Sequence, residues 1–248
     1  MAGRFTEKVA LVTGAGSGMG RAITIRLAAE GASVLAVDID EASLAETKAL
    51  VSGTVSVRTV DVADPPACAE AVAAAVSEFG RLDVLGNVAG IYLPAHTTET
   101  SIELYRRTLA VNLDGPFFLS QAAIPHLLAA GGTIINIASN SGIQGVPYSA
   151  AYAASKGGLI QLTRSLAVEF IKTPLRVNAI APAGTLTNIA RTVKFPEDQD
   201  PDLRRRMAGY RGIAMPEEIA ALFAFLASGE ARSITGAVYA VDNGLTVS

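Results

Sequence analysis

Short apolar runs alternate with longer stretches rich in Ala and Leu along most of the chain. The runs are nearly continuous, which is typical of strands that helices cover on both faces. This pattern predicts strands at residues 9–14, 33–38, 54–62, 82–90, 133–139, 175–182 and 237–244. It predicts helices at residues 21–31, 41–51, 65–79, 101–130 and 151–171, and another from about residue 216. We expect Gly115 and Pro116 to break the helix at 101–130.

Repeated strand–helix units with short loops predict a doubly wound, Rossmann-type α/β fold, with a mostly parallel seven-stranded sheet and helices on both faces. Because no repeat or linker divides the chain, we expect residues 1–248 to form a single domain. Residues 185–211 are an exception, since they are polar and irregular. They follow the carboxyl end of a strand, where such sheets bind ligands, and we interpret them as a mobile substrate loop. A plain surface loop is the alternative.

Composition narrows the possible functions. Half of the 248 residues are apolar and 17% are charged, which predicts a large buried core. The net charge is −3, and the only basic block is the arginine triplet at 204–206, which we interpret as a solvated helix face. A nucleic-acid partner is therefore not expected.

The single cysteine, Cys68, has no second cysteine for an internal disulfide, and we expect no metal cluster. We therefore interpret Cys68 as a small buried thiol. No apolar run approaches the roughly 18 residues that span a bilayer, and the first residues do not resemble a secretory signal. We therefore expect a cytoplasmic protein with no membrane partner.

The stretch TGAGSGMGR at residues 13–21 lies between the first predicted strand and helix. Glycine-rich loops at this position bind phosphates at the helix N-terminus. The glycines follow G-x-x-x-G-x-G rather than G-x-G-x-x-G, which selects Gly14, Gly18 and Gly20 and leaves Gly16 as a bystander. The loop residues expected to contact a dinucleotide are Gly14, Ser17, Gly18 and Met19.

Asp38 ends the second predicted strand, where a carboxylate can accept hydrogen bonds from the ribose hydroxyls of a bound dinucleotide. It would repel a 2′-phosphate, and the next residue, Ile39, is not basic. NAD is therefore expected rather than NADP. In the alternative interpretation, Asp38 caps the following helix, a role that Asp40 could also fill.

The next two strands also end in candidate cofactor contacts. We expect Asp61 and Val62 to lie at the adenine, although a solvated strand end is equally compatible with the pattern. Asn87, Ala89 and Gly90 close the fourth strand, where small residues let the backbone pass close to the cofactor.

Three polar residues in the second half of the chain indicate catalysis. Tyr152 and Lys156 are four residues apart on one helix face, and Ser139 ends the fifth strand. A tyrosine can act as general acid and base if its pKa falls from about 10, and a nearby ammonium or an oxidised nicotinamide favours the phenolate. The serine hydroxyl can hold the substrate oxygen. Each residue alone would be ordinary, but the combination behind a cofactor loop indicates an oxidoreductase.

These motifs resemble those of the short-chain dehydrogenase/reductase family, in its compact single-domain branch, over residues 8–244. The T-G-x-x-x-G-x-G loop matches residues 13–20, and N-N-A-G matches 87–90 with Val88 in second place. V-N-L-x-G-x-F matches residues 111–117. Y-x-x-x-K matches 152–156, thirteen residues after the serine, and P-G-x-x-x-T matches 182–187 with Ala183 in place of glycine.

The resemblance implies roles for individual residues. Tyr152 would be the acid and base, Lys156 would lower its pKa and hold the nicotinamide ribose beside it, and Ser139 would orient the substrate. Asn112 would anchor a water relay. The residues implied at the nicotinamide carboxamide are Pro182 and Thr187. We expect Val88, in place of the family's asparagine, to cause little functional loss. We expect Gly184 to supply any turn that Ala183 prevents.

The sequence thus predicts an NAD-dependent oxidoreductase that interconverts a secondary alcohol and a ketone by hydride transfer. The alternatives are an NADP-dependent 3-oxoacyl reductase and a non-catalytic dinucleotide-sensing protein. Segments 91–96, 140–148 and 185–211 are expected to line a pocket for a neutral, partly apolar small molecule. His96 and His126 are interpreted as structural or solvent-facing. The resemblance also implies a homotetramer, with contacts through residues 101–130 and 151–171 and the C-terminal strand, although that strand fits a buried core equally well.

Overall fold

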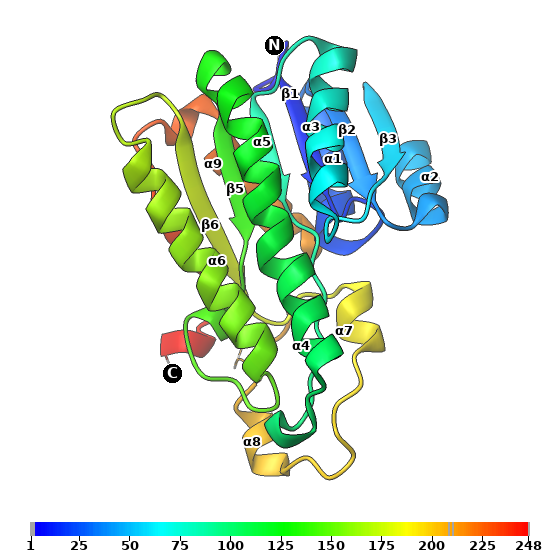
Figure 1. The fold of residues 1–248 in the computed structure, drawn as a ribbon, viewed down its shortest axis with the longest axis vertical. Helices are drawn as coiled ribbons and strands as arrows, with labels where there is room; N and C mark the ends of the chain where they lie inside the picture. Colours follow the sequence, from blue (N-terminus) through cyan, green and yellow to red (C-terminus); the bar gives the residue numbers. More distant parts are fainter. Residues whose placement is uncertain (1–2, 208, 210, 248) are drawn as a thin grey trace.

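The computed structural model describes residues 3–207, 209 and 211–247. Seven strands form one sheet in the order β3-β2-β1-β4-β5-β6-β7, and every neighbouring pair is parallel (Figure 1). The strands are β1 (Val9–Thr13), β2 (Ser33–Asp38), β3 (Val55–Thr59), β4 (Val84–Asn87), β5 (Thr133–Ile137), β6 (Arg176–Pro182) and β7 (Val238–Val241). The predicted doubly wound fold is confirmed, and the strand order reverses between β1 and β4.

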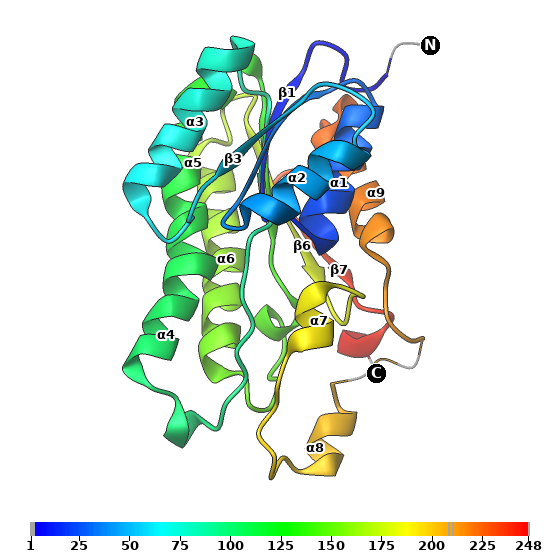
Figure 2. The ribbon, with the colours of Figure 1, turned by 90° about the vertical axis from the view of Figure 1, so that its right-hand side faces the viewer.

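Helices cover both faces of the sheet (Figure 2). One face carries α1 (Gly18–Ala29), α2 (Glu41–Leu50) and α9 (Pro216–Ala227); the other carries α3 (Pro65–Phe79), α4 (Ile102–Leu109), α5 (Gly115–Ala130) and α6 (Ala150–Glu169). Along β1, Ala10 and Val12 belong to the apolar core beneath α1 and α9, whereas Val9 and Leu11 belong to the core on the α3 side. Two buried faces explain why the strands have no polar alternation.

The expected break at Gly115 and Pro116 is replaced by a π-helical turn, Ala110–Asp114, that joins α4 to α5. A β-carbon at position 115 would lie 2.6 Å from the Val62 carbonyl oxygen, so glycine lets this helix approach the loop after β3. Proline at the start of α5 needs no amide hydrogen. Asn112 lies within this wider turn, a geometry often found at functional sites.

Residues 185–211 contain two short helices, α7 (Asn188–Thr192) and α8 (Pro201–Arg205), and residues 208 and 210 lie outside the described part. They extend beyond the carboxyl ends of the strands (Figure 2). Cys68 is fully buried, as predicted, and burial raises the pKa of its thiol to about 11. Among the described helices, none combines the length and apolar character needed to cross a membrane.

Candidate active site

The glycine loop turns sharply between β1 and α1 and packs against the end of β4. Gly14 has φ +64°, and a β-carbon there would lie 2.8 Å from Ala89 Cα. A β-carbon at Gly20 would lie only 2.0 Å from the Gly14 carbonyl oxygen. These contacts make both glycines necessary for the loop. Helix α1 begins at Gly18, three residues earlier than predicted, and the Ser17 side chain makes no capping hydrogen bond. The first amides of α1 are therefore available to an anion.

Gly16 is not a bystander, so that interpretation was wrong. Its amide donates a 2.9 Å hydrogen bond to Asp38 Oδ2, and a β-carbon would lie 2.9 Å from the same oxygen. Gly16 thus lets the loop approach the end of β2. Asp38 Oδ1 accepts from the Asp40 amide, whereas Asp40 caps α2 by accepting from the amides of Ala42 and Ser43. The helix-capping role therefore belongs to Asp40, and Asp38 faces the loop.

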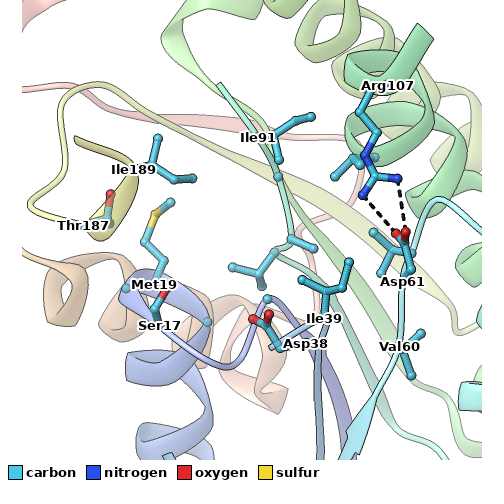
Figure 3. Close-up of a pocket in the computed structure, with 18 residues that line it drawn as sticks. Ser17, Met19, Asp38, Ile39, Val60, Asp61, Ile91, Arg107, Thr187 and Ile189 are labelled. Atoms are coloured by element: carbon cyan, nitrogen blue, oxygen red, sulfur yellow. Dashed lines mark hydrogen bonds and ion pairs between the residues drawn. The ribbon is translucent and has the colours of Figure 1, made fainter. Parts of the chain in front are cut away.

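A cavity of about 220 Å³ lies between the glycine loop and the ends of β2, β3 and β4 (Figure 3). Asp38, Asp61 and the loop surround it. The predicted cofactor residues that line this cavity are Gly14, Ser17, Gly18, Met19, Asp38, Ile39, Asp61, Val62, Ala89, Gly90 and Thr187. Uncapped helix amides at one side and a carboxylate at the other fit the diphosphate and adenosine ribose of a dinucleotide. The structure therefore brings these predicted residues together at one cavity, and their contact with a cofactor stays a prediction.

Asn87 does not line this cavity. Its side-chain amide donates to Asn136 Oδ1 at 2.8 Å and to Ser120 Oγ at 3.3 Å, so it ties β4 to β5 and α5. The next residue, Val88, is buried, and its amide donates to Thr13 Oγ1. Valine is therefore accommodated, since its side chain joins the apolar core that includes Ala10 and Val12 of β1.

Arg107 is a cavity residue that the sequence did not reveal. It reaches from α4 to Asp61, with 3.1 Å between Arg107 Nη1 and Asp61 Oδ2 (Figure 3). The two residues are 46 positions apart, and no motif joins them. The ion pair fixes the carboxylate at the edge of the cofactor cavity.

We expect Arg107→Gln to weaken NAD binding up to about fivefold while the free energy of unfolding changes by less than about 1 kcal/mol, because both partners are partly exposed. Calorimetric titration of NAD measures the first effect and urea unfolding the second. Arg106→Gln, on the same helix, is the matched control and should leave both unchanged. Equal NAD affinity in both variants would mean that Asp61 does not contact the cofactor.

Ser139 and Tyr152 line a second cavity of about 330 Å³ that shares Met19, Thr187 and Ile189 with the first. Burial raises the pKa of the Tyr152 phenol to about 12, while a hydrogen bond with Ser139 opposes that rise. The Ser139 hydroxyl also accepts from the Ser141 amide, which fixes its position. The serine and tyrosine predicted from their spacing therefore meet at one cavity.

Lys156 is buried behind Tyr152. Its Nζ donates to the Ile137 carbonyl at 2.8 Å and lies 5.9 Å from the centre of the Tyr152 ring. Burial lowers the pKa of this ammonium to about 8. The expected low pKa of Tyr152 is thus not a property of the protein alone, because burial disfavours both the Tyr152 phenolate and the Lys156 ammonium. A lower phenol pKa would need a further positive charge in the cavity.

Asn112 links α4 and α5 to the loop after β4. Its Oδ1 accepts from the Ile91 amide, and its Nδ2 donates to the Ile91 carbonyl and to Ser155 Oγ. A β-carbon at Gly90 would lie 3.2 Å from Asn112 Oδ1 and 3.4 Å from Lys156 Nζ. Glycine therefore leaves space between the two groups that the resemblance connects by a water relay.

The segment after β6 reaches both cavities. Pro182 lines the second cavity only, whereas Thr187 lines both and also caps α7. Neither Ala183 nor Gly184 adopts a positive φ. Alanine is therefore tolerated at 183 without help from Gly184, contrary to our expectation.

Most of the rest of the second cavity comes from the predicted segments, although only some of their residues face it, and Ala138, Ala183, Gly184 and Ile213 from outside them also line it. Tyr92 and Phe195 line it, with ring centres 5.9 Å apart, and Tyr92 lies 4.6 Å from the Tyr152 ring. Tyr148 instead accepts a 2.7 Å hydrogen bond from the Asp200 amide outside the cavity. The arginine triplet is exposed to solvent, as interpreted, and Arg204 in addition lines the cavity and stacks on Phe195.

His96 joins the loop after β4 to residues 195–203. His96 Nε2 lies 2.8 Å from Asp198 Oδ1, and the imidazole packs edge-on against Tyr148. The hydrogen bond to Asp198 raises the pKa of His96 and lowers that of Asp198. The structural role expected for His96 is therefore to hold the predicted substrate loop.

We expect residues 195–203 to exchange their amide hydrogens faster at about pH 9 than at about pH 6, after correction for intrinsic exchange. The raised pKa of His96 means that the ion pair is complete below 6.5 and is lost as the pH rises through that raised value. Mass spectrometry of deuterium uptake measures the effect. His96→Gln should show equal corrected exchange at both pH values. An unaltered pH difference in this variant would assign the effect to another group.

Known proteins match this chain over nearly its whole length. A family model described as enoyl-(acyl carrier protein) reductase matches residues 14–246. The chain is 39% identical to meso-2,3-butanediol dehydrogenase of Serratia marcescens over 246 residues, covering 99% of this chain and 97% of the relative. It is 39% identical to cis-4-hydroxycyclohexanecarboxylate dehydrogenase of Sinomonas cyclohexanicum over 250 residues, covering 98% of each. The structure of a 3-ketoacyl-(acyl-carrier-protein) reductase from Brucella melitensis complexed with NADH superposes with a TM-score of 0.89 at 32% identity, covering 98% of this chain and 99% of that one.

Proposed function

Because the chain belongs to the short-chain dehydrogenase/reductase family, we propose that it interconverts a secondary alcohol and a ketone with NAD as its cofactor. One observation carries this proposal: Ser139 and Tyr152 line a cavity that adjoins the dinucleotide cavity, with Lys156 buried behind the phenol. The named relatives act on a diol and on a cyclic hydroxy acid, both of which are secondary alcohols.

The protein's own residues hold the substrate and move its proton. Ser139 donates a hydrogen bond to the substrate oxygen, and the Tyr152 phenolate accepts the hydroxyl proton during oxidation. A dinucleotide held by the glycine loop, Asp38 and Thr187 would supply the hydride acceptor for the alcohol carbon. In its protonated form, the buried Lys156 stabilises the Tyr152 phenolate. This charge opposes the desolvation that raises the pKa of the phenol. In the reductive direction Tyr152 returns the proton to the carbonyl oxygen.

The preference for NAD rests on Asp38, whose carboxylate lines the dinucleotide cavity without a basic neighbour in the sequence. A 3-oxoacyl reductase remains the second candidate, because the Brucella relative has that activity in its name and is complexed with NADH. Cofactor preference alone therefore does not separate the two functions, contrary to our expectation from the sequence. The substrate panel below separates them.

The test is a panel of secondary alcohols and 3-oxoacyl thioesters, assayed by NADH absorbance. We expect NADH formation from at least one secondary alcohol at alkaline pH, and slower turnover with NADP. Turnover of thioesters alone would favour the second candidate. An absence of turnover with every compound and both cofactors would contradict an enzymatic function.

The assembly proposed with this function is a homotetramer built through α5, α6 and β7. Phe117 on α5 and Val168 on α6 are large apolar side chains with exposed fractions of 43% and 71%. Such exposure on neighbouring helices is typical of surfaces that a partner covers. Light scattering on the purified protein measures the mass. We further propose one domain over residues 1–248, a cytoplasmic location and a mobile loop at 185–211.

A further inference from the structure

The substrate cavity contains a single charged side chain among the described residues that line it. Arg204, from α8, lies in a wall made otherwise of apolar and uncharged polar residues, including Val146, Phe195 and Ile213. A guanidinium remains charged at any working pH, and Arg204, although exposed to solvent, places that charge on the wall of the cavity. The cavity therefore offers one cationic contact to an anionic group.

Arg204 is held at a defined place relative to the catalytic tyrosine. Its guanidinium carbon lies 3.6 Å from the centre of the Phe195 ring. Phe195 contacts Tyr92, and Tyr92 contacts Tyr152, so two aromatic rings connect the guanidinium with the catalytic phenol. Stacking uses the face of the guanidinium and leaves the N–H donors at its edge free for a planar acceptor.

Three of the neighbouring carboxylates are bound to other groups. Asp198 pairs with His96, Asp200 caps α8, and Asp202 pairs with Arg205 at 2.6 Å. Arg204 itself forms no ion pair with any described residue. An anionic ligand can therefore pair with it without displacing a carboxylate of the described residues.

We propose that Arg204 binds a carboxylate of the substrate, so that the enzyme acts on hydroxy acids and oxo acids rather than on neutral alcohols and ketones. This inference rests on the proposed function. The carbonyl oxygen lies at Ser139 and Tyr152, and the carboxylate lies across the cavity at the edge of the guanidinium. A planar two-oxygen acceptor matches the two parallel donors of a single arginine. Several carbons must separate the two groups, because the aromatic rings lie between them.

The test compares methyl-ketone acids of increasing length, such as 4-oxopentanoate and 5-oxohexanoate, with their methyl esters. We expect the wild type to reduce one of the acids with a kcat/KM about 10- to 100-fold higher than that of its ester. Arg204→Gln should abolish this preference, and Arg204→Lys should restore part of it. Arg205→Gln, on the same short helix, is the matched control and should keep the preference.

Two outcomes would overturn the assignment. Equal turnover of acid and ester by the wild type would mean that the cavity takes neutral substrates. An equal loss of kcat/KM with acid and ester in Arg204→Gln would mean that Arg204 only packs α8 against Phe195.

A binding measurement separates this inference from the proposed function. Hexanoate carries the carboxylate but has no carbonyl to reduce, and calorimetry should show it binding to the wild type at least about tenfold more tightly than to Arg204→Gln. Binding without any turnover would keep the carboxylate site and contradict the oxidoreductase. Turnover of esters alone, without hexanoate binding, would support the oxidoreductase and contradict the carboxylate site.

Discussion

Tyr152→Phe is expected to lower kcat by about 100- to 10,000-fold, the range that a positioned general acid and base contributes. The substitution removes only the hydroxyl, and phenylalanine keeps the ring that packs against Tyr92 at 4.6 Å. The lost hydrogen bond with Ser139 should change the free energy of unfolding by about 1 kcal/mol. NADH absorbance with the best substrate measures the rate, and thermal unfolding checks the fold.

The matched control is Tyr92→Phe, in the same cavity. The Tyr92 hydroxyl lies 2.8 Å from Ser149 Oγ, and this is its hydrogen-bond partner rather than Ser139. This variant should retain kcat within a few-fold, because no proton transfer depends on it. If Tyr152→Phe were as active as Tyr92→Phe, the assignment of the acid and base would be wrong.

The sheet could be predicted because burial on both faces leaves a local signal in each strand. The apolar runs at Val9–Thr13 and Thr133–Ile137 show it clearly. The meeting of Ser139 and Tyr152 at one cavity could also be predicted, because their positions follow from a strand end and a helix start. The turn before Gly115 was missed, since a π-helical turn has no distinct residue pattern and depends on how closely the helix approaches Val62.

Contacts between distant segments could not be predicted for a different reason. Arg107 meets Asp61, and His96 meets Asp198 across 102 positions, through side chains whose types are ordinary for solvated surfaces. Gly16 looked redundant because its role depends on the path of the loop past Asp38. These residues acquire a function only when the strand ends are brought together in space, which no local spacing describes.

Asp38→Asn is expected to shift the ratio of kcat/KM for NAD over NADP toward NADP by about 100- to 1,000-fold at low salt. The estimate follows from removing one negative charge about 5 Å from a 2′-phosphate at an effective dielectric constant near that of a protein surface. Asparagine keeps an oxygen that can accept from the Gly16 amide, so the loop should stay in place. Initial rates with both cofactors measure the ratio.

Asp40→Asn is the control that separates cofactor recognition from local structure. Asp40 carries the same charge two residues further along, but its side chain is used in capping α2, and asparagine is an equally good cap. Its cofactor ratio should therefore match the wild type. If both variants shifted the ratio equally, the preference would come from the general negative charge at the end of β2, and Asp38 would have no direct contact with the ribose. A shift confined to Asp38→Asn instead locates the discrimination at the carboxylate that the Gly16 amide holds.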